Sequence, residues 1–173
     1  MAHIAHFDNL TGLPNRRLLN DRMEQAIARG LRNGKMQAVC YVDLDNFKPV
    51  NDSYGHVAGD RVLIEAARRM EEPIRIEDTI ARLGGDEFVL LLVDLETVAE
   101  CEAVLRRIIA SLASPFTIAE GTVAELSASI GVALFPEDGR STDELVRKAD
   151  QAMYAAKQAG RNRVVFFSRA GAR

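Results

Sequence analysis

The sequence has few cysteines, no long hydrophobic run and no segment of low complexity. Its two cysteines, Cys40 and Cys101, lie far apart in apolar stretches and show no CxxC spacing. We therefore expect two buried thiols in a reducing compartment, and neither a disulfide framework nor a cysteine metal motif. No apolar run approaches the ~20 residues that span a bilayer, and no signal-peptide pattern opens the chain. These absences predict a soluble, cytoplasmic domain that makes no membrane contact of its own.

An excess of positive charge is also missing. The 173 residues hold 22 Lys+Arg against 25 Asp+Glu, a formal net charge of −3. Such a balance argues against a protein that coats nucleic acid or an anionic membrane. The basic residues other than Lys35, Lys48, Lys148 and Lys157 are all arginines, whose planar fork suits phosphate and guanine edges. This bias is a weak hint at nucleotides, and a GC-rich genome is the simpler explanation for it.

The length and the order of elements predict a single α+β domain. A chain of 173 residues with 47% hydrophobic residues builds a core without staples. No linker divides residues 1–173, of which 1–14 form an N-terminal segment. The hydrophobic periods predict a mainly antiparallel central sheet flanked by helices. We expect helices at 15–33, around 62–70, at 98–112 and at 141–156, and strands at 37–43, 79–83, 88–93, 127–135 and 164–167, with 116–118 and 122–126 beside the 127–135 strand and a turn-like stretch near 51–59.

Two acidic clusters stand at the ends of predicted strands. Asp43 and Asp45 close an apolar strand, and Asp86 and Glu87 follow the turn of a predicted hairpin. Carboxylates at such positions are costly unless they bind something, and hard cations are their usual ligand. If the hairpin lies beside the first strand, Asp86 and Asp43 form a Mg²⁺ site that takes its remaining ligands from phosphates. On spacing alone, two solvated acidic turns are an equally good interpretation.

The residues from Gly84 to Phe88 spell GGDEF, and the chain resembles the GGDEF domains, the diguanylate cyclases. The resemblance covers nearly the whole chain, in five further motifs in the family's order. These are DNLTGLPNR at 8–16, DLDNFK at 43–48, NDSYGHVAGD at 51–60, SIGV at 129–132 and ADQAMYAAK at 149–157 followed by GRN at 160–162. The resemblance implies a ferredoxin-like, palm-type nucleotidyl cyclase fold. It further implies synthesis of cyclic di-GMP from two GTP molecules.

The family pattern assigns the acidic residues to metal and catalysis. Asp43, Asp86 and the carbonyl of Leu44 would hold Mg²⁺, with Mn²⁺ as a substitute. Glu87 would help to hold metal or accept the 3′-hydroxyl proton, a choice that the sequence leaves open. Lys48 would stand with these groups as a catalytic residue that contacts phosphate.

The remaining matches concern the nucleotide. Asn51 and Asp60 correspond to the family's guanine readers, because an amide and a carboxylate match the polar edge of guanine. The nucleotide site implied by the resemblance also includes Phe47, Gly84, Gly85, Lys157 and Arg161. Compensation of the helix dipole is the alternative role for the last two.

A second site is implied upstream of the hairpin. Arg75 and Asp78 resemble the family's inhibitory RxxD motif, at the family's distance from the glycine pair. The resemblance implies that this loop binds cyclic di-GMP as a product inhibitor, with Arg106 as a second guanidinium. Without the family resemblance, the simpler interpretation is a solvated loop that contains an ion pair.

Other features are given ordinary roles or stay open. His56 is expected to pack and hydrogen-bond behind the guanine pocket, and Asp150 and Tyr154 are expected to support the site rather than bind ligand. Pro49 departs from the family pattern and removes one backbone donor.

Turnover implies a homodimer of half-sites, and the chain resembles the version fused to an EAL phosphodiesterase domain within a longer regulator. A regulatory module that binds GTP or cyclic di-GMP without turnover is the alternative. A generic interaction domain would leave the acidic clusters unexplained.

Overall fold

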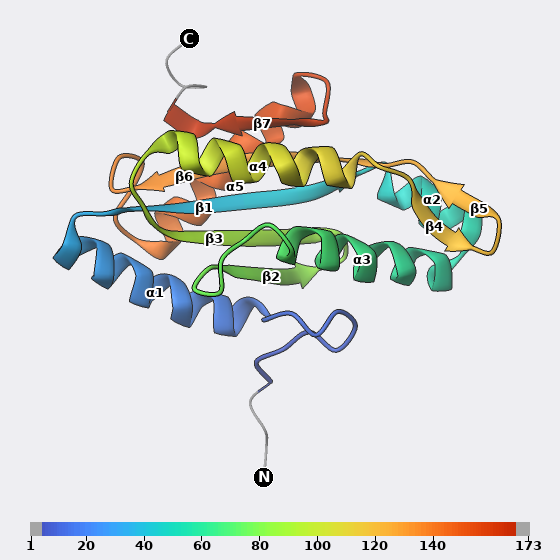
Figure 1. Ribbon diagram of the computed structural model, residues 1–173, viewed down its shortest axis with the longest axis horizontal. Helices are drawn as coiled ribbons and strands as arrows, with labels where there is room; N and C mark the ends of the chain where they lie inside the picture. The colour runs from blue at the N-terminus through green and yellow to red at the C-terminus, as the bar shows by residue number, and fades with distance from the viewer. Residues whose placement is uncertain (1–4, 169–173) are drawn as a thin grey trace.

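A five-stranded sheet organises the computed structural model, which describes residues 5–168 (Figure 1). The strands lie in the order β2-β3-β1-β6-β7, and β4 and β5 form a separate two-stranded sheet. The elements are α1 (Arg16–Asn33), β1 (Met36–Asp45), α2 (Phe47–Tyr54), α3 (His56–Glu71), β2 (Thr79–Gly84), β3 (Glu87–Leu95), α4 (Val98–Leu112), β4 (Phe116–Ala119), β5 (Thr122–Ala124), β6 (Ser127–Phe135), α5 (Thr142–Gln158) and β7 (Arg163–Phe166).

The central strand β1 pairs antiparallel with β3 on one side and with β6 on the other. The hairpin β2–β3 extends the sheet at one edge, and β7 joins β6 in parallel at the opposite edge. Three of the four neighbouring strand pairs in this sheet are therefore antiparallel, as expected. The predicted α+β class with a mainly antiparallel sheet is confirmed.

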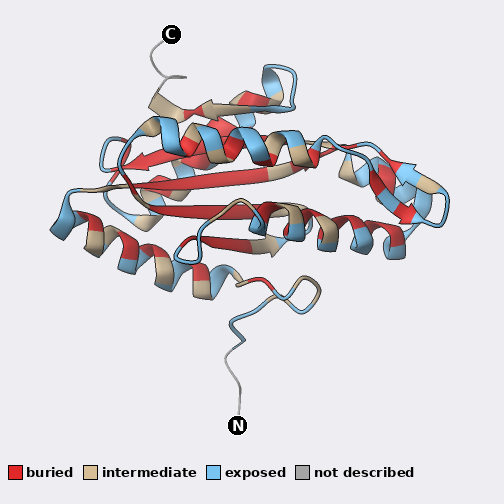
Figure 2. Ribbon diagram, viewed as in Figure 1, coloured by how far each residue is buried: buried red, intermediate tan, exposed pale blue. Residues whose placement is uncertain are grey.

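Helices cover both faces of this sheet. The apolar sides of α3 and α4 pack on one face in the larger core cluster, and α1 and α5 pack on the other. Figure 2 shows the result, since the strands are buried and each helix turns an exposed side to solvent. Contact between α5 and β6 is close enough to require glycine at Gly131, where a Cβ would lie 2.0 Å from the backbone nitrogen of Met153.

Three local predictions need correction. The stretch near 51–59, expected as a turn, is mostly helical, because residues 47–54 form α2 and α3 begins at His56. Pro49 sits in the first turn of α2, where a missing N–H removes no helical hydrogen bond. The segments at 116–118 and 122–126 do not flank β6, because β4 and β5 pair with each other instead. The hairpin turn is shifted by one residue, since Gly84 still pairs with Glu87 and leaves Gly85 and Asp86 as the turn.

The N-terminal segment is tied to the β2 edge. Residues 1–4 of the predicted segment 1–14 lie outside the described residues. Phe7 and Pro14 form an isolated bridge, and the carbonyl of Pro14 accepts from the backbone N–H of Arg82 at 3.0 Å.

Both cysteines are buried and free, which confirms the prediction of two buried thiols. Within 5–168, no helix combines the length and apolar character needed to cross a bilayer.

Candidate active site

The sheet brings Asp43 and Asp86 together at one end of β1. Asp43 stands opposite Glu87 in the β1–β3 register, so the turn that carries Asp86 lies beside the end of β1. The backbone N–H of Leu44 donates to the carbonyl of Asp86 at 3.3 Å. The prediction that the hairpin places these two carboxylates side by side therefore agrees with the structure.

The carboxylate of Asp43 has an incomplete set of partners. Its Oδ2 lies 2.6 Å from Nζ of Lys157 on α5. Its Oδ1 is buried and has no hydrogen-bond partner among the described residues. Because a buried carboxylate oxygen without a donor is unfavourable, this atom is poised to accept a cation.

The ionised form of Asp86 is unfavourable beside Asp43. Its burial, and then the hydrogen bond and charge of neighbouring Asp43, raise the pKa of Asp86 to about 7. The carbonyl of Leu44 faces the same turn, because the N–H and C=O of one strand residue point to the same neighbour. Two carboxylates and a carbonyl are all hard oxygen donors, so the residues present fit a divalent cation. Within 5–168, no group of three His, Cys, Asp or Glu side chains gathers to form a complete protein cage.

Asp45 lies only two residues from Asp43 but serves the fold. Its side chain is buried and accepts from the hydroxyls of Ser127 and Ser129, both at 2.7 Å, and from the backbone N–H of Asn162 at 3.1 Å. These bonds join the end of β1 to β6 and to the turn after α5. They thereby hold the end of α5, and with it Lys157, beside the carboxylate pair.

Tyr41 is a site residue that the sequence interpretation missed. It lies two residues before Asp43 on β1, diagonal to Glu87 on the neighbouring strand. Its burial, and then the carboxylate of Glu87 with which its hydroxyl is hydrogen-bonded, raise the pKa of Tyr41 above its usual range. The hydroxyl therefore stays protonated and donates to Glu87. The signal in the sequence is a tyrosine at i−2 from a site aspartate, on the same face of the strand.

Arg82 holds the hairpin turn at Gly85 and Asp86 in place. Its Nε donates to the carbonyl of Gly85 at 3.0 Å, and its Nη1 lies 3.0 Å from Oδ1 of Asp8. Burial opposes the ionised form of Asp8, but bonds from Thr11 and Arg82 outweigh it and lower the pKa of Asp8. The glycine pair is thus linked through one guanidinium to the N-terminal segment.

The predicted guanine residues stand on α2 and α3. Asn51 lies 3.3 Å from Nδ1 of His56, and a Cβ at Gly59 would lie 2.2 Å from Oδ1 of Asn51. Phe47 packs against the larger core cluster, on the α3 and α4 face of the sheet. Asp60 is exposed near the start of α3. His56 makes the expected hydrogen bond but is exposed rather than packed.

The three predicted phosphate contacts are placed differently. Lys157 reaches the carboxylate pair, as described above. Arg161 is exposed after α5, in a left-handed conformation at φ 65°, and its N–H donates to the carbonyl of Ala156 at 3.0 Å. The structure does not bring Lys48 to the carboxylates: its side chain is 88% exposed and pairs with Asp52 at 3.7 Å.

The predicted inhibitory loop is a closed turn. Oδ2 of Asp78 accepts from the backbone N–H of Arg75, and Oδ1 accepts from that of Val93, both at 2.9 Å. The guanidinium of Arg75 donates to the carbonyl of Val93 and is 49% exposed with the rest of its side chain. Asp78, with 4% of its side chain exposed, is therefore chiefly an anchor of the loop. Arg106 lies on the exposed side of α4, as expected.

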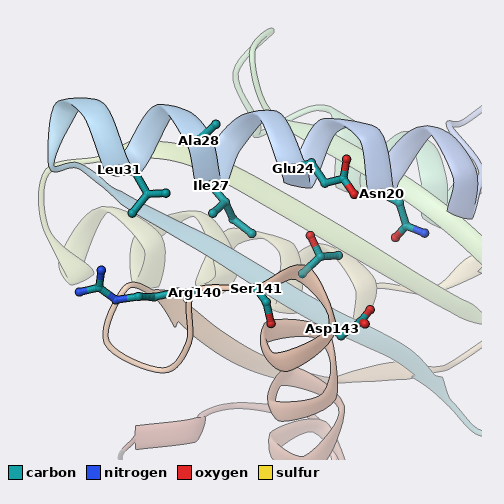
Figure 3. Close-up of a pocket in the computed structure, with 9 residues that line it drawn as sticks. Asn20, Glu24, Ile27, Ala28, Leu31, Arg140, Ser141 and Asp143 are labelled. Atoms are coloured by element: carbon teal, nitrogen blue, oxygen red, sulfur yellow. The ribbon is translucent and has the colours of Figure 1, made fainter.

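A groove of about 460 Å³ lies elsewhere, between α1 and the start of α5 (Figure 3). Its wall includes Ile27 and Leu31 from α1 and Arg140 and Asp143 near the start of α5. None of the predicted site residues lines it. The carboxylate edge, and not this groove, is where the chemistry-bearing side chains meet.

The mostly antiparallel sheet between helical layers, with paired carboxylates at a hairpin turn, places the chain among α+β domains with the fold of solved GGDEF domains. A profile of the family described as "Diguanylate cyclase, GGDEF domain" matches residues 5–163. The chain belongs to this family, and the resemblance found in the sequence is confirmed.

Individual relatives agree with this placement. The bifunctional diguanylate cyclase/cyclic di-GMP phosphodiesterase MucR of Pseudomonas aeruginosa is 49% identical over 167 residues, which are 96% of this chain and 24% of MucR. The solved GGDEF domain of TpbB from P. aeruginosa superposes with a TM-score of 0.91 at 39% identity, covering 93% of this chain and 94% of that one. The GGDEF domain of DgcB from Caulobacter crescentus, solved in complex with c-di-GMP, gives a TM-score of 0.86 at 28% identity, covering 97% and 99%. The chain thus spans about a quarter of MucR.

Proposed function

We propose that this domain is a diguanylate cyclase, which condenses two GTP molecules into cyclic di-GMP and releases two pyrophosphates. The observation that carries the proposal is the pair Asp43–Asp86 in a chain of the diguanylate cyclase family: one buried oxygen of Asp43 has no hydrogen-bond partner, and the pKa of Asp86 is raised to about 7. The intact GGDEF motif at the turn and the relationship to named cyclases support it.

Asp43, Asp86 and the Leu44 carbonyl would hold Mg²⁺, with Mn²⁺ as a substitute. The bound cation would neutralise the charge that develops on the α-phosphate. Arg82 holds the turn that carries Asp86, and Tyr41 holds the carboxylate of Glu87. Glu87 is then positioned to accept the proton of the attacking 3′-hydroxyl or to complete the metal site.

Guanine recognition belongs to Asn51 and Asp60. An amide oxygen and a carboxylate accept from the N1–H and N2–H₂ groups of guanine, and the amide N–H donates to O6; adenine offers no such edge. His56 fixes the amide of Asn51 through the hydrogen bond described above. Lys157 and Arg161 serve the phosphates, and the exposed ammonium of Lys48 reaches them only after leaving Asp52.

Turnover requires two domains. One domain holds one GTP, so each 3′-hydroxyl must attack the α-phosphate of a nucleotide on a second copy, and the active form is a homodimer of half-sites. We further propose that the domain works in the cytoplasm within a longer signalling protein, of the type that MucR exemplifies.

The test is direct. Concentrated protein is incubated with GTP and Mg²⁺, and cyclic di-GMP and pyrophosphate are quantified by chromatography and an enzyme-coupled assay. We expect one cyclic di-GMP for two pyrophosphates, with a rate that rises more steeply than linearly with protein concentration. GTP binding without any product would instead favour the regulatory module that binds nucleotide without turnover.

Product binding at the Arg75 loop is a second proposed function. The half-exposed guanidinium of Arg75 suits phosphate and the O6/N7 edge of guanine, and the anchored Asp78 keeps the loop in shape. Since β2 joins this loop to Gly84, bound cyclic di-GMP, with Arg106 as a further contact, would restrain the metal turn.

Calorimetric titration of cyclic di-GMP tests this second function. Arg75→Ala should abolish binding at the loop and relieve product inhibition. Arg68→Ala is the matched control, because Arg68 is an exposed arginine that pairs with Glu65 outside the loop. Equal affinity in Arg75→Ala and the parent protein would return the loop to a purely structural role.

A further inference from the structure

The ion pair between Lys157 and Asp43 has features that a permanent structural pair lacks. The ammonium lies 2.6 Å from Oδ2, but the other carboxylate oxygen is buried and has no partner. Nearby Asp45, by contrast, has both oxygens satisfied by three donors. Asp43 is thus neutralised by Lys157 without being saturated by it.

The pair is also free to open. The side chains of Lys157 and Asp43 are 25% and 14% exposed, so water reaches both. Lysine carries its charge on a flexible four-carbon stem with three donors, which allows it to exchange one anion for another. Lys148 on the same helix offers a contrast, since its ammonium is committed to the carbonyl of Asp138 at 2.6 Å and lies over the ring of Phe167.

A divalent cation at the carboxylate pair cannot share Asp43 with an ammonium without repulsion. Two cations on one partly buried carboxylate repel by several kcal/mol at an effective dielectric of about 20. When the cation is present, Lys157 must therefore leave Asp43, and its three donors need another anion. Arg161 follows the end of α5, so a phosphate chain between Lys157 and Arg161 would supply that anion.

We propose that Lys157 is a displaceable counter-ion, which neutralises Asp43 in the nucleotide-free domain and moves to the nucleotide phosphates when a divalent cation binds. This inference rests on the proposed function, because it requires the metal site at Asp43 and Asp86. It adds that Lys157 weakens cation binding in the absence of nucleotide. Cation and nucleotide then bind with positive coupling. The nucleotide draws Lys157 away from Asp43, where the cation binds, and the cation frees Lys157 from Asp43 to bind the phosphates.

The test measures Mn²⁺ binding to the nucleotide-free protein. Free aqueous Mn²⁺ is followed by electron paramagnetic resonance, whose signal falls as the ion binds. Lys157→Met should bind Mn²⁺ about tenfold more tightly than the parent, whereas Lys157→Arg, which keeps the charge, should stay near the parent value. Arg161→Met is the matched control: it removes one positive charge just beyond the same helix, but within residues 5–168 Arg161 makes no ion pair with Asp43 or Asp86.

Each outcome of the Mn²⁺ titration either supports or overturns the exchange of Lys157. Tighter binding in Lys157→Met alone supports the exchange. Unchanged or weaker binding in Lys157→Met overturns it, and so does equal tightening in Arg161→Met, which would reflect net charge only. Asp43→Asn separates the two levels: if it leaves Mn²⁺ binding intact, the metal site itself is wrong, and if it abolishes binding while Lys157→Met has no effect, only the exchange fails.

Discussion

Asp43 and Asp45 lie at the same end of the same strand, but their carboxylates differ in how fully they are hydrogen-bonded. Asp45 accepts three hydrogen bonds and is fully used by the fold. Asp43 pairs with Lys157 and keeps one buried oxygen without a partner. Burial of Asp86, and then the neighbouring Asp43 carboxylate, raise the pKa of Asp86 to about 7. A carboxylate whose oxygens are all hydrogen-bonded stabilises the fold, whereas a buried carboxylate oxygen without a partner, next to a second carboxylate, marks a candidate ligand site. The difference separates scaffold from site within three residues.

The largest expected effect concerns Asp86. Asp86→Asn keeps the size of the side chain but removes an anionic metal ligand, so turnover should fall by about a thousandfold or more. Product formation with GTP and Mg²⁺ measures the rate, and circular dichroism confirms that the variant is folded. Product at a near-parental rate would mean that Asp86 is not a metal ligand.

The next effect tests the contrast itself. Asp45→Ala removes a buried, hydrogen-bonded carboxylate and should lower the free energy of unfolding by about 3 kcal/mol. Asp43→Ala in metal-free buffer should change it by less than about 1 kcal/mol, because loss of the Lys157 pair is offset by relief of the repulsion at Asp86. Urea denaturation at pH 8 measures both. Equal losses for the two variants would erase the distinction between scaffold and site.

A smaller effect is expected at the base pocket. Asn51→Ala should weaken GTP binding about tenfold to thirtyfold and reduce discrimination against ATP, because guanine then leaves polar groups unpaired. Competition titrations of GTP and ATP measure the ratio. Tyr54→Ala, an exposed residue at the end of the same helix, provides the control. If the ratio is the same in Asn51→Ala and the parent, guanine is recognised elsewhere.

The smallest effect is a pH dependence of stability. The raised pKa means that the folded, metal-free domain binds the Asp86 proton more tightly than the unfolded chain does. Between the ordinary aspartate pKa of 3.8 and about 7, this group therefore lowers the free energy of unfolding as pH rises, and the loss is complete above about 7. The thermal midpoint with chelator should fall by a few degrees over this window, and less in Asp86→Asn. Identical pH profiles would show that Asp86 ionises normally.

Much of this arrangement was predictable from the sequence because local patterns agree with the fold. The apolar strand before Asp43 and the glycine pair before Asp86 placed both carboxylates correctly. The spacing from Val98 to Leu112 likewise gave α4 with its boundaries. Where each segment has one strong local preference, the tertiary structure follows it.

The rest depends on contacts that no local pattern encodes. Helix α2 holds Pro49 and several turn-forming residues, and it forms because Val50 is buried and Gly59 lets Asn51 pack closely. The roles of Asp43 and Asp45 differ only because Ser127, Ser129 and Asn162 converge on one of them. The hydrogen bond of Tyr41 with Glu87 likewise requires knowledge of the strand register.

The most direct measurement is the position of a bound ion. Crystals of this chain grown with Mn²⁺ and a non-hydrolysable GTP analogue would locate manganese by its anomalous scattering. We predict a peak at coordination distance, about 2.0–2.3 Å, from a carboxylate oxygen of Asp43, a carboxylate oxygen of Asp86 and the carbonyl oxygen of Leu44. A nucleotide bound with its manganese away from Asp43 and Asp86 would contradict the assignment of this edge as the catalytic metal site.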